Sequence, residues 1–154
     1  VFYSSFFLKI MENHHTLQLE NQLCFPLYAI AKEIIGLYRP FLDAIDITYP
    51  QYLVMMVLWE NDGLTVNQIG AKLYLDSGTL TPLLKRLEVK GFIIRKRKKE
   101  DERVVEVFLA DKGRNLQQKA CEIPAKMQEK LNLTIEDLVE LKETVQKILN
   151  KIQK

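Results

Sequence analysis

A cysteine in the stretch ENQLCFPLY (residues 20–28) lies where a thiol can react. Pro26 lacks a backbone N–H, so it is tolerated without loss in the first turn of a helix, and a helix that begins near Leu23 puts Cys24 in that turn. The helix dipole there favours the thiolate, which is the reactive form of cysteine. Tyr28 follows at i+4 and shares the same helix face. From position alone, a buried and inert cysteine is the commoner case.

A second group of residues has the chemistry of nucleic-acid contact. Five consecutive basic residues, 95–99, lie in the stretch FIIRKRKKEDERVVEVFLADKG. Because side chains alternate faces along a strand, this run leaves no apolar face to bury, so a hairpin here must project from the core. On the returning strand, Arg103 is placed to enter a minor groove, and Asp101 is placed to hold its guanidinium. Isolated charge runs are more often solvated surface, and an exposed Asp–Arg pair adds little stability.

The elements that must position these residues are marked by helix signals. The apolar spacing predicts a first helix from about Leu23 to Tyr38, ended by Pro40, because the residue before proline avoids the helical region. Thr48 and Gln51 form a T-x-x-Q capping box that opens the next helix. That helix carries YLVMMVLWE into the core.

A helix-turn-helix follows. Thr65 and Gln68 form a second capping box before VNQIGAKL, three residues make the turn, and SGTLTPLLKRLEVKG gives the second helix, with Gly91 suited to a left-handed position past its end. Phe92, Ile93 and Ile94 are expected to root the hairpin in the core. A helix-turn-helix followed at once by a projecting basic hairpin is a winged helix.

The winged helix predicts which residues meet DNA. The second helix begins with small polar residues, which let a helix N-terminus approach phosphates and the groove. Two basic residues lie further along it for phosphate contact. The predicted DNA-binding residues are Ser77, Thr79, Thr81, Lys85, Arg86, Arg95, Lys98, Lys99, Asp101 and Arg103.

The remaining chain is helical. The stretch GRNLQQKACEIPAKMQEKL is predicted to be one segment, bent or broken near Pro124, and Thr134 with Asp137 starts a last helix. Its apolar residues form one stripe that needs a partner: Ile135, Leu138, Leu141, Val145, Ile148, Leu149 and Ile152. Either this stripe packs on its own domain, or the first and last helices together build a dimer.

Composition sets the outer limits. The 154 residues, 47% hydrophobic and 27% charged, suit one soluble globular domain, and the net charge of +2 leaves charge distribution to decide on nucleic-acid binding. No stretch approaches the roughly 20 apolar residues of a membrane span. Residues 1–10 precede Met11 and lack the marks of a signal peptide, so a cytoplasmic protein is expected, in which two cysteines make no disulfide framework.

The chain resembles the MarR family of dimeric regulators. The resemblance rests on the order of elements, on the wing motif EDER, and on LENQLCFPLYA, LDAIDITYPQYLVMMVLWE and LYLDSGTLTPLLKRLE, which resemble the organic hydroperoxide repressors of that family and their staphylococcal thiol-sensing relatives. It covers roughly residues 17–124. It implies a mainly α fold with a small β-wing, a winged helix-turn-helix, and a homodimer.

The resemblance also implies roles for the thiol and its neighbours. Cys24 corresponds to the cysteine that organic hydroperoxides and related oxidants attack, and its hydrogen-bonding tyrosines correspond to Tyr28, Tyr38 and Tyr49, some from the second subunit. Cys121 is a candidate resolving cysteine. Some members form an intersubunit disulfide, whereas others have one cysteine that a low-molecular-weight thiol caps or that is overoxidised. We slightly favour the second type of chemistry for this chain, in which a single cysteine is capped or overoxidised.

The predicted organisation follows from these assignments. Residues 1–16 form a flexible extension, 17–44 a dimerisation and sensor helix, 45–113 the DNA-binding region and 114–154 the C-terminal dimerisation helices. The partners are a pseudo-palindromic DNA duplex, with half-sites about 10 base pairs apart, and a second copy of the chain. No cofactor or metal is predicted, and His14 and His15 are explained by a flexible tail.

Two other functions remain open. A thiol peroxidase would share the reactive cysteine, but the chain has no C-x-x-C recycling motif and the basic wing would go unexplained. A ligand-gated MarR regulator would bind a phenolic effector between the dimer helices and the DNA-binding lobes. Substitution of Cys24 by serine distinguishes the thiol sensor from the ligand-gated regulator. It should leave DNA binding intact and abolish a peroxide response, but it should not affect a response to a phenolic effector.

Overall fold

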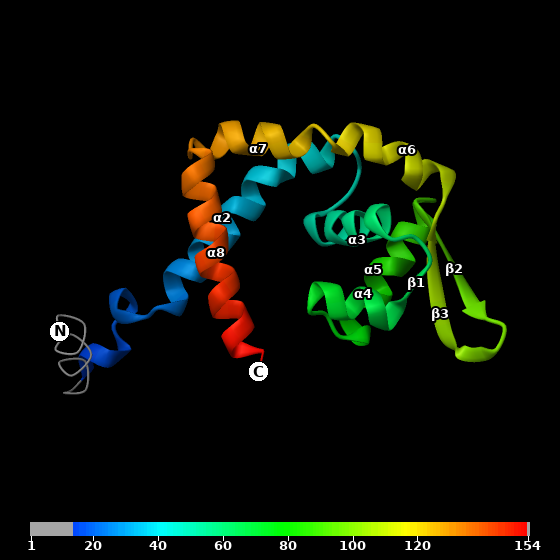
Figure 1. The fold of residues 1–154 in the computed structure, drawn as a ribbon, viewed down its shortest axis with the longest axis horizontal. Coiled ribbons are helices and arrows are strands. Elements are labelled where there is room, and N and C mark those ends of the chain that lie inside the picture. The colour runs from blue at the N-terminus through cyan, green and yellow to red at the C-terminus, as the bar shows by residue number, and fades with distance from the viewer. Residues whose placement is uncertain (1–13, 154) are drawn as a thin grey trace. The chain divides into compact units, whose positions relative to one another are not determined.

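The structure is a computed structural model that describes residues 14–153 (Figure 1). The chain divides into two compact units, the first ending at Leu37 and the second beginning at Tyr38. Two short 3-10 helices, η1 (His14–Leu17) and η2 (Leu19–Asn21), precede the first long helix. Most of the predicted N-terminal extension, residues 1–16, lies outside the described residues.

Helix α2 (Cys24–Asp43) begins as the sequence predicts and ends later. Cys24 is its first residue, so Pro26 falls in the first turn, where its missing N–H has no intrahelical partner to lose. The prediction that Pro40 ends the helix is wrong. The helix continues for a last turn in which Leu42 is buried to 2% exposure, and this burial offsets the one backbone hydrogen bond that the proline removes.

Three helices form the core of the second unit. They are α3 (Tyr49–Glu60), α4 (Val66–Leu73) and α5 (Ser77–Val89), and both predicted capping boxes are present. The Gln51 side chain accepts from the backbone N–H of Thr48 (3.0 Å), and the Gln68 side chain accepts from that of Thr65 (2.9 Å). Side chains without any exposure meet at the centre of these helices: Val54, Met55, Leu58, Ile69, Leu80, Leu84 and Leu87.

A small antiparallel sheet completes the winged helix, in the order β1-β3-β2. The strands are β1 (Leu64–Thr65), β2 (Ile93–Lys98) and β3 (Asp101–Leu109), and β2 and β3 form the predicted projecting hairpin (Figure 1). The two-residue β1 was not predicted, because Thr65 was assigned only to the cap of α4. Ile93 is buried at 1%, but the predicted burial of Ile94 is wrong, since it is 44% exposed. Alternation along β2 turns it to the opposite face.

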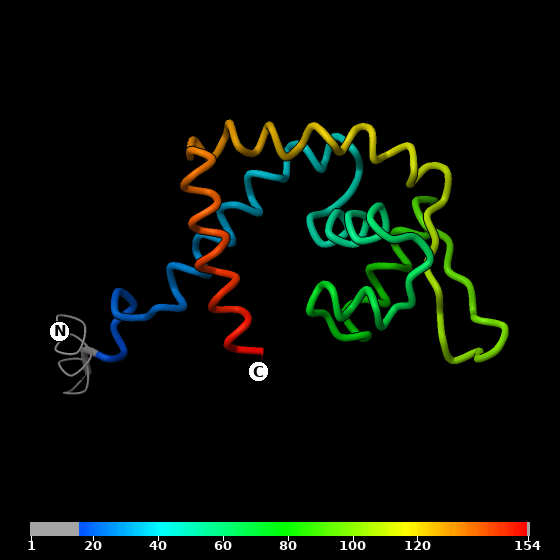
Figure 2. Tube along the Cα trace, viewed as in Figure 1, coloured from blue at the N-terminus to red at the C-terminus, as the bar shows by residue number. Residues whose placement is uncertain are grey.

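The C-terminal segment forms three helices, α6 (Asp111–Ala120), α7 (Ile123–Leu131) and α8 (Ile135–Ile152). The predicted break near Pro124 is confirmed and falls at residues 121–122, so the proline lies in the first turn of α7. In Figure 2 the chain turns sharply between α7 and α8, where Asn132 adopts a left-handed conformation (φ 50°). No helix among the described residues is long and apolar enough to cross a membrane.

Helix α6 is fixed to the winged helix by close contacts around Gly113. The indole N–H of Trp59 donates to the Gly113 carbonyl oxygen (2.9 Å), and Arg114 forms an ion pair with Asp62 (2.7 Å). Asp62 also accepts from the backbone N–H of Leu109 (2.7 Å). A Cβ atom at position 113 would overlap the carbonyl oxygen of Phe92. Only glycine therefore allows α6 to approach this closely.

We expect Gly113→Ala to destabilise the fold by about 1–3 kcal/mol, because the added methyl group forces backbone apart rather than a flexible side chain. Urea unfolding followed by circular dichroism measures this loss. The matched control is Gly36→Ala within α2, where an added Cβ meets no atom within 4 Å. That control should be neutral or stabilising by about 0.5–1 kcal/mol, since alanine favours a helix over glycine. Equal stability of both variants would contradict the close approach.

Candidate DNA interface and thiol site

The wing and the helix-turn-helix share a hollow of about 320 Å³. Arg103 of β3 enters it from the wing, Ser77 and Thr81 from the first turns of α5, and Thr65 and Asn67 from the start of α4. Arg103 and the first residues of two helices therefore line the same open space. Such a surface favours anions, because helix N-termini carry partial positive charge and unpaired N–H groups.

The start of α5 is ordered by its own side chains. The Asp76 carboxylate accepts from the backbone N–H of Thr79 (2.9 Å) and from its hydroxyl (2.8 Å), and these bonds, the backbone one first, lower the pKa of Asp76. The Thr81 hydroxyl donates to the Ser77 carbonyl oxygen (2.7 Å). Both threonine hydroxyls thus donate their protons within the chain and keep lone pairs as acceptors. The cation that faces this helix end in the hollow is Arg103.

An irregular register shapes the wing around Arg103. Arg97 pairs with Val105, whereas its neighbour Lys98 pairs with Asp101, so β3 carries extra residues between these two pairs. The Asp101 carboxylate accepts from the backbone N–H of Arg103 (3.1 Å). It was predicted to hold the guanidinium; the contact present orders the backbone instead. Bulges of this kind re-aim side chains, and here the bulge accompanies the turn of Arg103 into the hollow.

The other predicted DNA-binding residues differ in their surroundings. Lys85, Arg86, Lys98 and Lys99 are exposed, as a phosphate contact requires. Arg95 is not free in this way, because its guanidinium and its backbone N–H bind the Glu88 carboxylate.

The thiol and one of its predicted tyrosine partners lie in the first unit. Cys24 is exposed at the first residue of α2, and Tyr28, one turn later, is 65% exposed. An exposed thiol at the first residue of a helix is accessible to an oxidant. The described chain therefore does not bury Cys24 as a core residue.

The other two predicted tyrosines lie in the second unit, where they touch. The ring centroids of Tyr38 and Tyr49 are 5.0 Å apart, and Tyr52 lies 6.0 Å from Tyr38. Burial raises the pKa of all three, so their hydroxyls stay protonated and are hydrogen-bond donors. Tyr52 was missed, because its position inside the apolar run of α3 is typical of a core residue and gives no separate sequence signal.

The second cysteine lies at the C-terminal end of α6. Cys121 is exposed, and its thiol donates to the Gln118 carbonyl oxygen (2.9 Å). The thiol is therefore accessible on the surface of the described chain, at the break before α7.

Comparison with known proteins places the chain in a family. Residues 36–120 match the family model described as transcriptional regulator SarA/Rot. The chain is 49% identical over 140 residues to the organic hydroperoxide resistance transcriptional regulator of Bacillus subtilis, covering 90% of this chain and 95% of that protein. This chain belongs to the MarR family. Within it, the chain falls in the organic hydroperoxide repressor group, as the sequence resemblance indicated.

Solved structures agree with the MarR assignment. Reduced AbfR bound to DNA, a protein of Staphylococcus epidermidis, is 34% identical and superposes with a TM-score of 0.75, covering 90% of this chain and 97% of that one. AbfR has also been solved overoxidised and bound to DNA, with 36% identity, a TM-score of 0.73, and coverage of 88% of this chain and 96% of that one. Its disulfide form is 36% identical, with a TM-score of 0.65 and coverage of 88% of this chain and 94% of that one. The predicted winged-helix fold class is thereby confirmed.

In this MarR-family chain, two polar residues that line the hollow were missed by sequence reasoning. Thr65 and Asn67 were assigned only to the start of α4, and no DNA contact was predicted for them. The capping box at Thr65 is a signal that locates a helix N-terminus. It does not show that this N-terminus faces Arg103, since that depends on the pairing of β1 with β3.

Proposed function

We propose that the chain is a redox-sensing repressor that binds duplex DNA through α5 and the wing and releases it when Cys24 is oxidised by an organic hydroperoxide. The observation that carries the DNA-binding part is the hollow that joins Arg103 to Ser77 and Thr81. The comparisons support the regulatory part, since the Bacillus subtilis relative is named a transcriptional regulator and AbfR was solved bound to DNA. Such a protein acts in the cytoplasm, where its operator is.

On DNA, α5 enters a major groove and the wing crosses to the adjacent minor groove. Arg103 is then favoured by the negative potential of the minor groove, and the exposed Lys98 and Lys99 meet phosphates. The backbone between the two grooves passes the hollow, where the start of α4 faces it. Two copies of the chain read a pseudo-palindrome whose half-sites lie about 10 base pairs apart.

The oxidation step balances with one hydroperoxide. The Cys24 thiolate attacks the terminal oxygen of ROOH, the O–O bond breaks, sulfur becomes a sulfenic acid, and the alkoxide leaves as ROH after taking a proton. A second thiol then attacks the sulfenic sulfur, a disulfide forms, and water leaves. The second thiol is either a low-molecular-weight thiol or the partner subunit's Cys121.

The forms in which AbfR has been solved favour a disulfide as the releasing state. AbfR was found bound to DNA when reduced and also when overoxidised, and a separate structure holds it in its disulfide form. By analogy, we expect a sulfinic or sulfonic acid at Cys24 to leave this chain on DNA. The bulk and tether of a disulfide, rather than added oxygen, then drive release.

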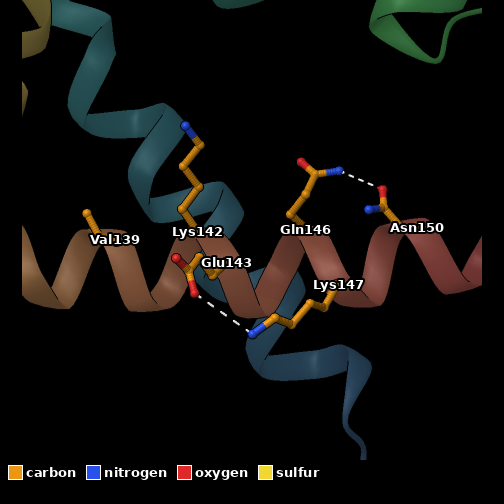
Figure 3. Close-up of a pocket in the computed structure, with 6 residues that line it drawn as sticks. All are labelled: Val139, Lys142, Glu143, Gln146, Lys147 and Asn150. Carbon is orange, nitrogen blue, oxygen red and sulfur yellow. Dashed lines mark hydrogen bonds and ion pairs between the residues drawn. The ribbon is translucent and has the colours of Figure 1, made fainter.

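The functional division of the chain is part of the same proposal. Residues 45–113 bind DNA, and residues 17–44 and 114–154 hold the dimer. Helix α8 has no buried residue within the described chain, and most of its apolar side chains are exposed, whereas Leu138 and Leu149 are half-buried. Its opposite, polar face carries its own pairs, Glu143 with Lys147 and Gln146 with Asn150 (Figure 3). The apolar face is therefore the one that requires a partner.

The wing substitutions test the DNA-binding part. Arg103→Ala should weaken binding to a duplex that the reduced wild type selects from a random-sequence pool. Lys98→Ala and Lys99→Ala should instead flatten the salt dependence, by up to about 0.9 in the logarithmic slope for each phosphate that a subunit no longer neutralises. Fluorescence anisotropy between low and moderate salt gives both quantities. If affinity and slope stay unchanged in all three variants, the wing does not bind DNA.

A further inference from the structure

An ion pair joins the end of the recognition helix α5 to the base of the wing. The Glu88 carboxylate accepts from the Arg95 Nε (2.9 Å) and Nη2 (2.6 Å) with one oxygen, and from the Arg95 backbone N–H (3.0 Å) with the other. Glu88 lies in the last turn of α5, and Arg95 is the third residue of β2. Both carboxylate oxygens are thus used to hold one residue of the wing.

This pair differs from the chain's other ion pairs in its burial. The side chains of Arg95 and Glu88 are only 23% and 34% exposed. In every other ion pair between described residues, at least one partner is more than half exposed. Exposed pairs contribute little, whereas a partly desolvated arginine held at two nitrogens is strongly oriented. The bonds from Arg95, its guanidinium first, also lower the pKa of Glu88, so the carboxylate is charged at neutral pH.

The pair lies where it sets the direction of the hairpin. Arg95 pairs in register with Val107, which is fully buried, and beyond it β2 leads to the exposed lysines and the bulge that carries Arg103. The connection from α5 to β2 is short and turns at Gly91 (φ 77°). A contact across this turn therefore controls the angle between the wing and α5.

We propose that Glu88 is a positioning residue for DNA binding, which holds Arg95 away from DNA and thereby fixes the wing so that Arg103 and α5 engage adjacent grooves together. This inference rests on the proposed DNA-binding function. It assigns Arg95 an internal role, in place of the phosphate contact that the basic run suggested.

The two roles of Arg95 predict opposite results when Glu88 is neutralised. Removing a carboxylate near DNA reduces repulsion, and a released Arg95 that met a phosphate would steepen the salt dependence by up to about 0.9 per subunit. Binding would then strengthen at low salt. If the pair positions the wing, Glu88→Gln weakens binding, and the salt dependence does not become steeper.

The experiment measures affinity and salt slope for wild type, Glu88→Gln and Arg95→Lys on the selected duplex. We expect Glu88→Gln to weaken binding by about 10-fold, within the range that coupling between sites spans. Arg95→Lys keeps the charge and would serve equally as a phosphate contact, but it loses the two-nitrogen contact, so a similar loss is expected. The matched control is Glu106→Gln, another acid of the same hairpin, which should bind as tightly as wild type or more tightly.

A double-mutant cycle separates positioning from a general loss of structure. In an Arg103→Ala background the wing's main contact with DNA is already gone. Adding Glu88→Gln should therefore weaken DNA binding by less than about 2-fold further. The exchanged pair, Glu88→Arg with Arg95→Glu, should recover binding relative to either single exchange. Thermal unfolding shows whether each variant is folded; if Glu88→Gln is not, Arg95→Lys and the exchanged pair still decide.

Each result has one interpretation. If the wild type selects no duplex, the proposed function fails, whatever Glu88 does. If the wild type binds but Glu88→Gln binds equally or more tightly with a steeper slope, Arg95 is a phosphate contact and the positioning role is refuted. A full 10-fold loss that persists in the Arg103→Ala background refutes it as well, since the effect would not pass through the wing.

Discussion

Cys24→Ser is expected to bind the selected duplex as tightly as the reduced wild type and to lose its response to organic hydroperoxide. Serine keeps the size and polarity of the side chain at the exposed start of α2, so no structural change is expected. A hydroxyl does not form a sulfenic acid or a disulfide, because its oxygen is not oxidised by a peroxide under these conditions. The wild type, by contrast, should lose about 5–150-fold in affinity on oxidation, the range typical of coupled sites.

The titration follows DNA binding by anisotropy while organic hydroperoxide is added, with and without a small thiol. Intact mass identifies the product at each step. Cys121→Ser is the matched control, since it removes the other exposed cysteine. If this variant responds only when the small thiol is present, the releasing form is a mixed disulfide. If it never responds, the partner subunit's Cys121 is required.

One experimental outcome would refute the redox proposal. Unchanged DNA binding by wild type whose Cys24 is shown by mass to be fully converted to a disulfide would end it. A ligand-gated regulator would then remain. Overoxidised protein that stays on DNA does not contradict the proposal, because that outcome is expected from the AbfR comparison.

Local signals predicted the winged helix well. The capping boxes at Thr48 and Thr65 fixed the starts of α3 and α4, and Gly91 marked the turn after α5. Each of these signals acts within a few residues, because a cap or a left-handed turn is satisfied by its immediate neighbours. The basic run likewise predicted a projecting hairpin, since no alternating pattern of burial was available to it.

Features that depend on tertiary packing were mispredicted or missed. Pro40 lies inside α2 because the burial of Leu42 outweighs the tendency of a helix to end before proline. Ile94 was mispredicted as buried because the alternation of side chains along a strand was not applied to this short apolar run. Arg95 illustrates the same limit. Its basic neighbours suggest DNA contact, but the partner that determines its role, Glu88, lies on another element. Sequence spacing does not reveal which of five adjacent cations is engaged internally.

The thiol site was predicted from family resemblance more than from local signals. Residue patterns placed Cys24 in a first turn and Tyr28 on its face, and α2 begins at Cys24. Tyr38 and Tyr49 are brought together by packing between the end of α2 and the start of α3, at 5.0 Å. They lie in the second unit, and the thiol lies in the first. Their role toward the thiol is therefore still a prediction.

The largest loss of DNA binding is expected from charges placed on the apolar face of α8. Leu141, Val145, Ile148 and Ile152 recur at spacings of four, three and four residues, which puts them on one stripe. Val145 and Ile148, near its middle, are 43% and 39% exposed in the chain by itself. We expect Val145→Glu with Ile148→Glu to prevent dimerisation, because each carboxylate would have to lose its water in the interface without a partner.

A monomer loses the second half-site as well as the interface. When two half-sites are bound by one dimer, the second contact is intramolecular, and its loss weakens binding by about 100-fold or more. Light scattering at micromolar concentration should change from twice the 18.0 kDa chain mass to that mass. The matched control is Gln146→Glu with Asn150→Glu, which adds the same charge to the polar face of α8 (Figure 3) and should stay dimeric. A monomeric wild type would refute the dimer, and a dimeric Val145→Glu, Ile148→Glu variant that still binds DNA would show that α8 is outside the interface.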